Sequence, residues 1–508
     1  MNSQGSSRGD FRTIYQGQSV DDLIIEYMEQ NAVPGMSLAI VQAPYITRVV
    51  GYGLADTQSK RLVSTRTVFH VGQITTAYTA VAIMQLHEEG KLDLDDCIIS
   101  YLPSSAPPSW ENTSIRHLIT HSSGIPDYTN SKGFSYQHQY APTEIINLIK
   151  DETLLFPSGT ESQMSASNFY LLGLIVEQAS GMSYEAYITK NQIERMGLQR
   201  TFFINTLSSL ENETSNGTKP FKHSEFLKNP IFVDPTEHAV GNSTDNATAP
   251  DVSWTSSFAN SGILASAQDI SIWDIGLAGG ILVKNAENRA FLYQSPMLAN
   301  QQKISGNAGW SFPGHPGLMH IKGNIPGFSA FLSRFTAANE LVCVTLLANK
   351  ENLTDLDILA RKIAAAFDIK LAAMDGGLKA ETIQSPYTVQ QTIERLRSIV
   401  SKKGGKIFAH IDHSAEANKV NQSLLPTEVL IIGNPAKGTA LMQENPAVAL
   451  DLPLRIMVTE DQNGEVWLNF ADPIKLKEDY HLQGNEARQI ATALRNLCEQ
   501  AVSIQSNF

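Results

Sequence analysis

The sequence predicts two globular domains, each built from both helices and strands. The chain has 508 residues, which is more than one ordinary core accommodates. Helical and strand-like hydrophobic patterns occur in both halves, and residues 374–380 carry paired glycines without apolar periodicity. We therefore expect a flexible N-terminus over 1–18, a large α/β domain over 19–370, a linker over 371–384 and a small α+β domain over 385–508.

The composition is that of a soluble globular protein, with 42% hydrophobic and 18% charged residues. A formal net charge of -13 argues against a nucleic-acid partner, because binding a polyanion requires a concentrated basic surface. Cys97, Cys343 and Cys498 are too far apart in sequence for a disulfide framework or a zinc ribbon. The N-terminal residues lack the pattern of a secretion signal, and no stretch reaches the roughly 20 apolar residues of a membrane span. We expect a cytoplasmic protein without metal, cofactor or membrane span.

The large domain opens with an amphipathic helix. Ser19 and Asp22 form the pattern of a capping box, in which a hydroxyl accepts from a free backbone N–H of the first turn. Two apolar runs, Met36–Val41 and Ile46–Val50, then fit a pair of strands. A strong helix follows over Ile74–Glu89, and Gly90 is placed to end it. This order predicts a sheet covered by helices.

The second half of the large domain contains an irregular segment followed by regular elements. Residues 205–250 are rich in Asn, Ser and Thr with little periodicity, so we expect a long surface excursion near the pocket. Strands are expected at Phe328–Phe335 and Leu341–Leu347, and a final helix at Leu356–Phe367.

The small domain alternates helices and strands. Asn463-Gly464 is a good hairpin turn between Leu454–Val458 and Val466–Phe470. A closing helix presents one apolar face through Ile490, Leu494, Leu497 and Ala501. The remaining expected elements are a helix at Thr388–Val400 and strands at Ile407–Ile411 and Val429–Ile432.

Four segments of the large domain carry a resemblance to a known family. They are MQLHEEGKLDLDD at 84–96, IRHLITHSSGIPDY at 115–128, FYLLGLIVE at 169–177 and IPGF at 325–328. Together they resemble the bacterial superfamily of serine β-lactamases and penicillin-binding proteins, closest to class C β-lactamases, D-alanyl-D-alanine carboxypeptidases and related esterases. The resemblance implies an antiparallel sheet flanked by helices, with a helical subdomain.

The first catalytic motif of that superfamily is absent. Its enzymes carry a nucleophilic serine at the N-terminus of a buried helix and a lysine three residues later. The resemblance places these positions at Gln73 and Thr76. A glutamine amide is no acyl-accepting nucleophile, and Thr76 has no adjacent basic residue. The acyl-enzyme route is therefore expected to be closed.

The other two motifs are also degenerate. The family's Tyr-x-Asn falls on Met164-Ser-Ala166, and its Lys-Thr-Gly or His-x-Gly falls on Ile321-Lys-Gly323. Strand alternation sends Lys322 and His320 to the face opposite Ile321. The resemblance nevertheless implies a retained oxyanion hole, because its donors are the main-chain N–H groups at Gln73 and near Asn324.

Two features of the large domain can be read in more than one way. The degenerate pocket either binds a ligand or is a relic cavity, and a third reading makes Thr75 or Thr76 the nucleophile. His117 and His121 are four residues apart on an expected helix, as in half a metal site. No third ligand accompanies them, so we favour a structural role for His121.

The small domain resembles a second bacterial family, domain of unknown function 302, which implies a compact α+β fold without established chemistry. His410, Asp412 and His413 form either a catalytic or metal-binding group, or a helix cap at Asp412 beside surface histidines; we favour the cap. Asp451 is read as a turn carboxylate rather than a general base. The segments that carry the resemblance are residues 392–396, 408–413, 430–435, 441–442 and 449–455.

These observations lead to three functional hypotheses. The first is a pseudoenzyme that binds an unidentified small molecule or peptide or acts as a scaffold, with the small domain mediating homo-oligomer or partner contacts. The binding positions would be Gln73, Thr76, Met164, Ala166, Ile321, Gly323 and Asn324. The alternative is a hydrolase of esters or amides that combines the retained oxyanion hole with a non-standard nucleophile or an activated water. A weaker hypothesis assigns the chemistry to the small domain.

Overall fold

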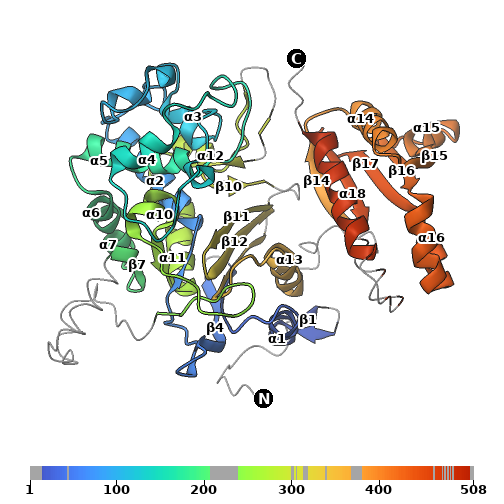
Figure 1. The fold of residues 1–508 in the computed structure, drawn as a ribbon, viewed down its shortest axis with the longest axis horizontal. Coiled ribbons are helices and arrows are strands. Elements are labelled where there is room, and N and C mark those ends of the chain that lie inside the picture. Colours follow the sequence, from blue (N-terminus) through green and yellow to red (C-terminus); the bar gives the residue numbers. More distant parts are fainter. Residues whose placement is uncertain are drawn as a thin grey trace. The chain divides into compact units, whose positions relative to one another are not determined.

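The structure is a computed structural model that describes residues 14–503 with gaps. The described residues form two compact units, divided at residues 372–373, and each unit has its own sheet (Figure 1). The predicted excursion at 205–250 falls largely outside the described residues. The gaps are 16, 43–44, 206–237, 299–302, 305, 313–317, 338–339, 368–379, 462–463, 472, 474–475, 477–479, 481 and 483–485.

The first unit contains an eight-stranded sheet in which all neighbouring strands are antiparallel. The predicted strand pair and the two later strands are confirmed, although each is longer in the structure. In sheet order the strands are β5 (Arg61–Leu62), β4 (Tyr45–Asp56), β3 (Gly35–Gln42), β13 (Glu340–Ala348), β12 (Phe328–Ala337), β11 (Leu318–Ile325), β10 (Trp310–Ser311) and β9 (Gly306–Asn307).

Helices cover both faces of this sheet. Along β3, Leu38 and Ile40 pack with α1 (Val20–Gln30) and α13 (Leu356–Phe367), whereas Ala39 belongs to the core on the other face. This alternation follows from the two-residue period of a strand. The predicted capping box is confirmed, because Ser19 Oγ accepts from Asp22 N at 3.1 Å and Asp22 Oδ2 accepts from Ser19 N at 3.0 Å.

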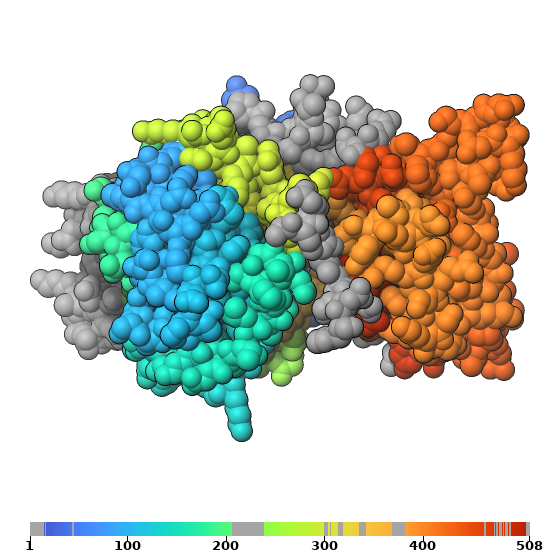
Figure 2. Space-filling view, turned by 90° about the horizontal axis from the view of Figure 1, so that it is seen from above, coloured from blue at the N-terminus to red at the C-terminus, as the bar shows by residue number. Residues whose placement is uncertain are grey.

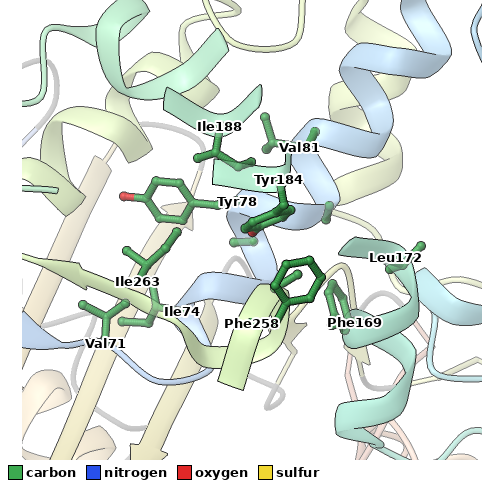
Figure 3. Packing of buried hydrophobic residues seen from close by; sticks show 14 of the residues in the cluster. Val71, Ile74, Tyr78, Val81, Phe169, Leu172, Tyr184, Ile188, Phe258 and Ile263 are labelled. Carbon is green, nitrogen blue, oxygen red and sulfur yellow. The ribbon is translucent and has the colours of Figure 1, made fainter. Parts of the chain in front are cut away.

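The helix α2 (Ile74–Glu88) is the centre of the larger core. Every residue from Ile74 to Leu86 is buried, so this helix has no solvent face. Tyr78 stacks on Trp273 with ring centroids 4.1 Å apart. Figure 3 shows Tyr78 and Val81 of α2 in one cluster with Phe169, Tyr184 and other side chains of the surrounding elements. A helix enclosed in this way holds its N-terminus in a fixed position.

Among the remaining elements of the first unit, α11 (Ala267–Ala278) packs against β3 and β13 of the large sheet, and the others include the helical subdomain and a small sheet of order β6-β8-β7. Segments coloured blue and teal, which belong to the helical subdomain, form much of the face of the first unit in Figure 2. The helices are α3 (Ile115–Ile119), α4 (Pro142–Ile149), α5 (Ala166–Ser180), α6 (Tyr184–Ile188), α7 (Glu194–Met196), α10 (Trp254–Ser261), α11 (Ala267–Ala278) and α12 (Ala286–Leu292), and the strands are β6 (Phe69–His70), β7 (Thr201–Phe203) and β8 (Ile263–Ala265), beside a short pair, β1 (Ile14–Tyr15) and β2 (Gln18–Ser19).

The second unit is a five-stranded antiparallel sheet of order β14-β18-β17-β16-β15. Its core packs α14 and α18 together against the sheet. The predicted hairpin is confirmed, because Glu460 pairs with Val466 and Gly464 has a φ of 77°. The elements are β14 (Ala380–Ser385), α14 (Val389–Lys402), β15 (Lys406–Asp412), α15 (His413–Lys419), β16 (Thr427–Gly433), α16 (Pro435–Glu444), β17 (Leu454–Glu460), β18 (Val466–Ala471) and α18 (Glu486–Val502).

One boundary differs from the expectation. The predicted linker runs to residue 384, but Ala380–Ser385 forms β14 and pairs with β18 at the edge of the second sheet. This strand has the sequence AETIQS, in which Ile383 is the one large apolar residue. An edge strand needs little apolar surface, so the hydrophobic pattern that identifies strands is weak here.

Candidate functional site

The candidate site lies where the N-terminus of α2 meets strand β11. Gln73 is the N-cap residue of α2, and its side chain caps none of the helix N–H groups. The side chain is partly exposed, whereas its neighbours on both sides are buried. It therefore projects from a rigid base toward the surface.

Two glycines allow the loop before α2 to approach β11 closely. A Cβ atom on Gly323 would lie 2.2 Å from the Val71 carbonyl oxygen, and one on Gly72 would lie 2.8 Å from the Asn324 nitrogen. Gly72 also has a φ of 52°, a left-handed conformation that glycine adopts at little cost. Any larger residue at either position would push the loop away from the strand.

This close approach brings the Gln73 side chain onto the backbone of β11. The Asn324 N–H donates to Gln73 Oε1 at 2.7 Å. Asn324 itself is held by Asn352, whose N–H donates to Asn324 Oδ1 at 2.8 Å while Asn324 Nδ2 donates to Asn352 Oδ1 at 2.8 Å. The amide carbonyl of Gln73 thus occupies one of the two main-chain donors that were expected to form an oxyanion hole.

The hydroxyl groups of Thr75 and Thr76 form hydrogen bonds with the main chain. Thr76 Oγ1 donates to the Gln73 carbonyl oxygen at 2.7 Å, a common way for a helical threonine to satisfy its hydroxyl. Thr75 Oγ1 accepts from Ile263 N at 3.2 Å. Both side chains are buried. Gly309, with a φ of 85°, closes the space beside Thr76, because a Cβ there would lie 2.0 Å from Thr76 Oγ1.

The positions of the second motif lie just before and at the start of α5. Met164 has 65% of its surface exposed, which is unusual for a large apolar side chain. Ser165 is the N-cap residue of α5 and Ala166 is its first residue. The Ala166 N–H donates to Asp127 Oδ2 at 2.9 Å. Neither Met164 nor Ala166, the residues at the Tyr and Asn positions of the motif, offers a group that could transfer a proton.

The third motif shows the expected alternation along β11. Ile321 is buried in the core that contains α2, whereas Lys322 is exposed and its Nζ lies 3.2 Å from Asp357 of α13 on the opposite face. His320 is buried beside Phe331, with ring centroids 5.0 Å apart. Burial lowers the pKa of His320. Gly323 and Asn324 are therefore the residues of this motif that adjoin Gln73.

Both histidines of the 115–128 segment have local structural partners. His117 Nδ1 accepts from Ser114 N at 3.2 Å. His121 Nδ1 accepts from Ser165 N at 3.3 Å and lies 3.0 Å from Asn168 Nδ2. Among the residues that the structure describes, no group of three or more His, Cys, Asp or Glu side chains is arranged to hold a metal ion.

In the second unit, His410, Asp412 and His413 do not act on a common partner. Asp412 is the N-cap residue of α15, and its Oδ1 accepts from Ala415 N at 2.8 Å and from Ser414 Oγ at 2.6 Å. The hydrogen bond from Ser414 is the main reason that the pKa of Asp412 is lowered. His410 Nε2 lies 2.6 Å from Glu428 Oε2. The Tyr480 hydroxyl donates to Asp451 Oδ2 at 2.5 Å. His413 is exposed at the start of α15.

Sequence reasoning missed the partners that define both sites. Asn324 was expected at the oxyanion hole, but its bond to Gln73 joins positions 251 residues apart. Glu428 reaches His410 from the neighbouring strand β16. No local pattern marks such pairs. The glycines at 72 and 309 are a weak signal, since a glycine beside a motif often permits a close backbone approach.

Comparison with known proteins identifies both regions. The family model described as "Beta-lactamase" matches residues 20–367, more than half of the chain. The chain belongs to the beta-lactamase family. The model described as "Domain of unknown function DUF302" matches residues 381–501.

Solved structures share the fold at low sequence identity. A structure titled a class C beta lactamase has a TM-score of 0.54 at 20% identity, covering 68% of this chain and 96% of its own. The octameric penicillin-binding protein homologue from Pyrococcus abyssi has a TM-score of 0.55 at 19% identity, covering 89% of both chains. At these identities the likeness concerns the fold alone.

Curated relatives match over shorter stretches. Protein flp of Staphylococcus aureus (strain NCTC 8325 / PS 47) is 28% identical over 192 residues, which are 37% of this chain and 39% of that protein. The fluoride-specific ion channel FluC 1 of Brucella suis is 35% identical over 168 residues, 32% of this chain and 63% of that protein. The chain thus spans less than two thirds of either relative. Within its described residues, this beta-lactamase family member has no helix with the length and hydrophobicity of a membrane span.

Replacement of Gly323 by alanine should destabilise the first unit. The added methyl group would lie 2.2 Å from the Val71 carbonyl, so the loop and strand must separate. We expect a loss of about 1–3 kcal/mol in the free energy of unfolding, measured by urea denaturation. Gly438→Ala is the control, since its Cβ would meet only Leu452 Cδ1 at 3.7 Å. Equal stability of Gly323→Ala and the wild type would contradict the close approach.

Acidification should destabilise the first unit through buried histidines. Burial lowers the pKa of His70 to about 3 and that of His121 to about 4, whereas unfolded histidine titrates near 6.5. The unfolded chain therefore binds protons first, and stability is lost as pH falls from about 7 toward 4. Each histidine contributes up to about 2 kcal/mol of this loss between pH 7 and pH 5.

Urea midpoints at pH 7 and pH 5 measure this effect. His121→Gln should reduce the difference between the two pH values, although it also removes native hydrogen bonds. His138→Gln, which changes an exposed histidine of the same unit, should leave the difference unaltered. A midpoint that does not fall on acidification would count against neutral, buried histidines.

Proposed function

We propose that the first unit is a catalytically inactive β-lactamase-like pocket, which binds a small molecule or peptide or serves as a scaffold. The observation that carries this proposal is the hydrogen bond from Asn324 N to Gln73 Oε1 at 2.7 Å. Acyl transfer in this fold requires an attacking oxygen, a base beside it and a free oxyanion hole. The Gln73 side chain supplies no attacking oxygen and fills part of the hole.

The base is missing as well. Thr76 stands where the superfamily carries lysine, and its hydroxyl donates to the Gln73 main chain. A threonine hydroxyl is not ionised near neutral pH, so it cannot take the nucleophile's proton as a neutral lysine amine could. Met164 and Ala166, at the position of the second motif, carry no ionisable group. All three motifs therefore support an inactive pocket.

A ligand for such a pocket would offer its own carbonyl or carboxylate oxygen to the same donor. It would replace the Gln73 carbonyl on the Asn324 N–H, so binding exchanges one hydrogen bond for another. The net gain would then come from the remaining contacts, because an exchanged hydrogen bond contributes little by itself. Such a pocket would select its ligand by shape rather than by reactivity.

The second candidate function is a hydrolase that uses the hole with an activated water. The retained glycines at 72 and 323 favour it, since they keep the loop and strand at the separation that two converging N–H donors need. This function requires the Gln73 side chain to swing away. Thr75 and Thr76 are poor nucleophile candidates, because both are buried and hydrogen bonded within the core.

Scaffolding through self-association has separate support. The octameric penicillin-binding protein homologue from Pyrococcus abyssi resembles this chain over 89% of its length. We propose that the present chain also forms a homo-oligomer, with the second unit taking part. Light scattering of the full chain at micromolar concentration measures the mass directly, and a monomer would exclude this role.

Covalent labelling tests the inactive pocket. Neither a fluorescent penicillin nor a fluorophosphonate should label the wild-type chain, and Gln73→Ser should also stay unlabelled because Thr76 cannot act as its base. A class C β-lactamase serves as the positive control. Stoichiometric acylation of the wild type, or turnover of a p-nitrophenyl ester that survives Thr75→Ala and Thr76→Ala, would establish the hydrolase instead.

Hydrogen exchange tests the occupied donor. Gln73→Leu removes the acceptor, so the Asn324 amide should exchange about fivefold faster, as expected for the loss of one hydrogen bond worth about 1 kcal/mol. Gln73→Glu is the matched control, since a carboxylate oxygen can still accept. Unchanged exchange in Gln73→Leu would remove the main support for an occupied hole.

A further inference from the structure

The second unit contains an open cavity of about 590 Å³ at one end of its sheet. Its lining comes from the end of α14, the start of β15, the end of β16, helix α16, the segment from Ala449 to the start of β17, and the middle of α18. The walls are mainly apolar and include Val400, Ile432, Met442, Leu452, Leu494 and Leu497. A volume of this size lies within the range of roughly 300–1,000 Å³ that is typical of small-molecule sites.

The cavity is open to solvent rather than an imperfection of the core. Phe408, one of its lining residues, is 48% exposed. Gly438 lies within α16, where glycine costs about 1 kcal/mol relative to alanine. A Cβ atom on Gly438 would meet only Leu452 Cδ1, at an ordinary contact distance of 3.7 Å. Steric crowding therefore does not explain this glycine, which leaves the space beside α16 unfilled.

Three lysines belong to the lining. Lys403 follows the end of α14, Lys406 begins β15 and Lys437 lies in the first turn of α16, and all three are exposed. Lys406 Nζ lies 5.1 Å from the centre of the Phe408 ring. The described lining contains no aspartate or glutamate, although the whole chain has a net charge of -13. The cavity thus joins a local positive charge to an apolar interior.

We propose that this cavity binds a single-chain anionic amphiphile, of the class of medium-chain fatty acids, taken up as a free monomer. Its alkyl chain would occupy the apolar interior, and its carboxylate would lie among the three lysines. The lysine stems can line the apolar wall while their ammonium groups remain in water. A cationic amphiphile would meet like charge at the opening, and a nucleic acid would find no surface for its bases.

Isothermal titration calorimetry of the full-length chain with dodecanoate, below its critical micelle concentration, tests the proposal. We expect one saturable site, with affinity rising about fourfold for each methylene from octanoate to dodecanoate. Dodecyltrimethylammonium has the same alkyl chain and the opposite charge, and it should bind about tenfold more weakly or not at all.

Paired variants locate the site. Gly438→Trp should abolish dodecanoate binding by filling the cavity, whereas Gly438→Ala should bind as the wild type does. Lys403→Gln combined with Lys437→Gln should weaken binding about three- to tenfold. Lys402→Gln is the control, because Lys402 is exposed on α14 and lies outside the described lining. Circular dichroism and urea unfolding check that each variant is folded.

The experiments distinguish a monomeric fatty acid from a second copy of the chain and from a membrane surface. No saturable dodecanoate binding, equal affinity for the cationic analogue, or binding that survives in a folded Gly438→Trp variant would each overturn the proposal. So would a wild-type dimer that Gly438→Trp converts to a monomer, since a second copy of the chain would then cover the cavity. Binding to anionic vesicles without binding of monomeric dodecanoate would point to a membrane surface and would equally reject a free monomer.

Discussion

The close contact between the loop before α2 and strand β11 sets the geometry of the first unit's site. Gly72 and Gly323 make this contact possible, because a side chain at either position would overlap backbone atoms of the other segment. Both segments are rigid: α2 is enclosed by the core on every side, and β11 lies inside the eight-stranded sheet. Whatever residue stands at position 73 is therefore presented to the N–H of Asn324.

In such a scaffold the backbone determines the geometry of the site, whereas the side chains determine its chemistry. The main-chain donors belong to the backbone, so they persist when every catalytic side chain is replaced. Gln73 offers a neutral acceptor to one of them, which satisfies the donor and brings no reactivity. The Asn324–Asn352 pair then fixes the strand end from the other side. The result is a site whose geometry is set by backbone and amide hydrogen bonds.

Much of the fold was predictable because its signals are local. The capping box at Ser19, the enclosed helix from Ile74 and the hairpin at Gly464 each follow from residues within one or two turns of chain. The motif positions followed from a family resemblance, which the match over residues 20–367 bears out. The edge strand β14 was not predicted, because its pairing with β18, rather than an apolar pattern of its own, makes it a strand.

The contacts of the two candidate sites were not predictable in the same way. Gln73 and Asn324 are joined by tertiary packing, and His410 meets Glu428 only because β15 and β16 are adjacent. The sequence could place a residue in the correct motif position, but not identify what its side chain touches. The cavity of the second unit is a further case, since its walls come from several elements that are far apart in sequence.

The turn at Gly309 limits the side chains that position 76 can hold. Its backbone is packed so tightly on the Thr76 hydroxyl that a single added carbon would overlap it, and a lysine there is longer than threonine by several atoms. A lysine at position 76 would require the β9–β10 turn to move as well. Positions 76 and 309 therefore constrain each other, and a longer side chain at one calls for a compensating change at the other.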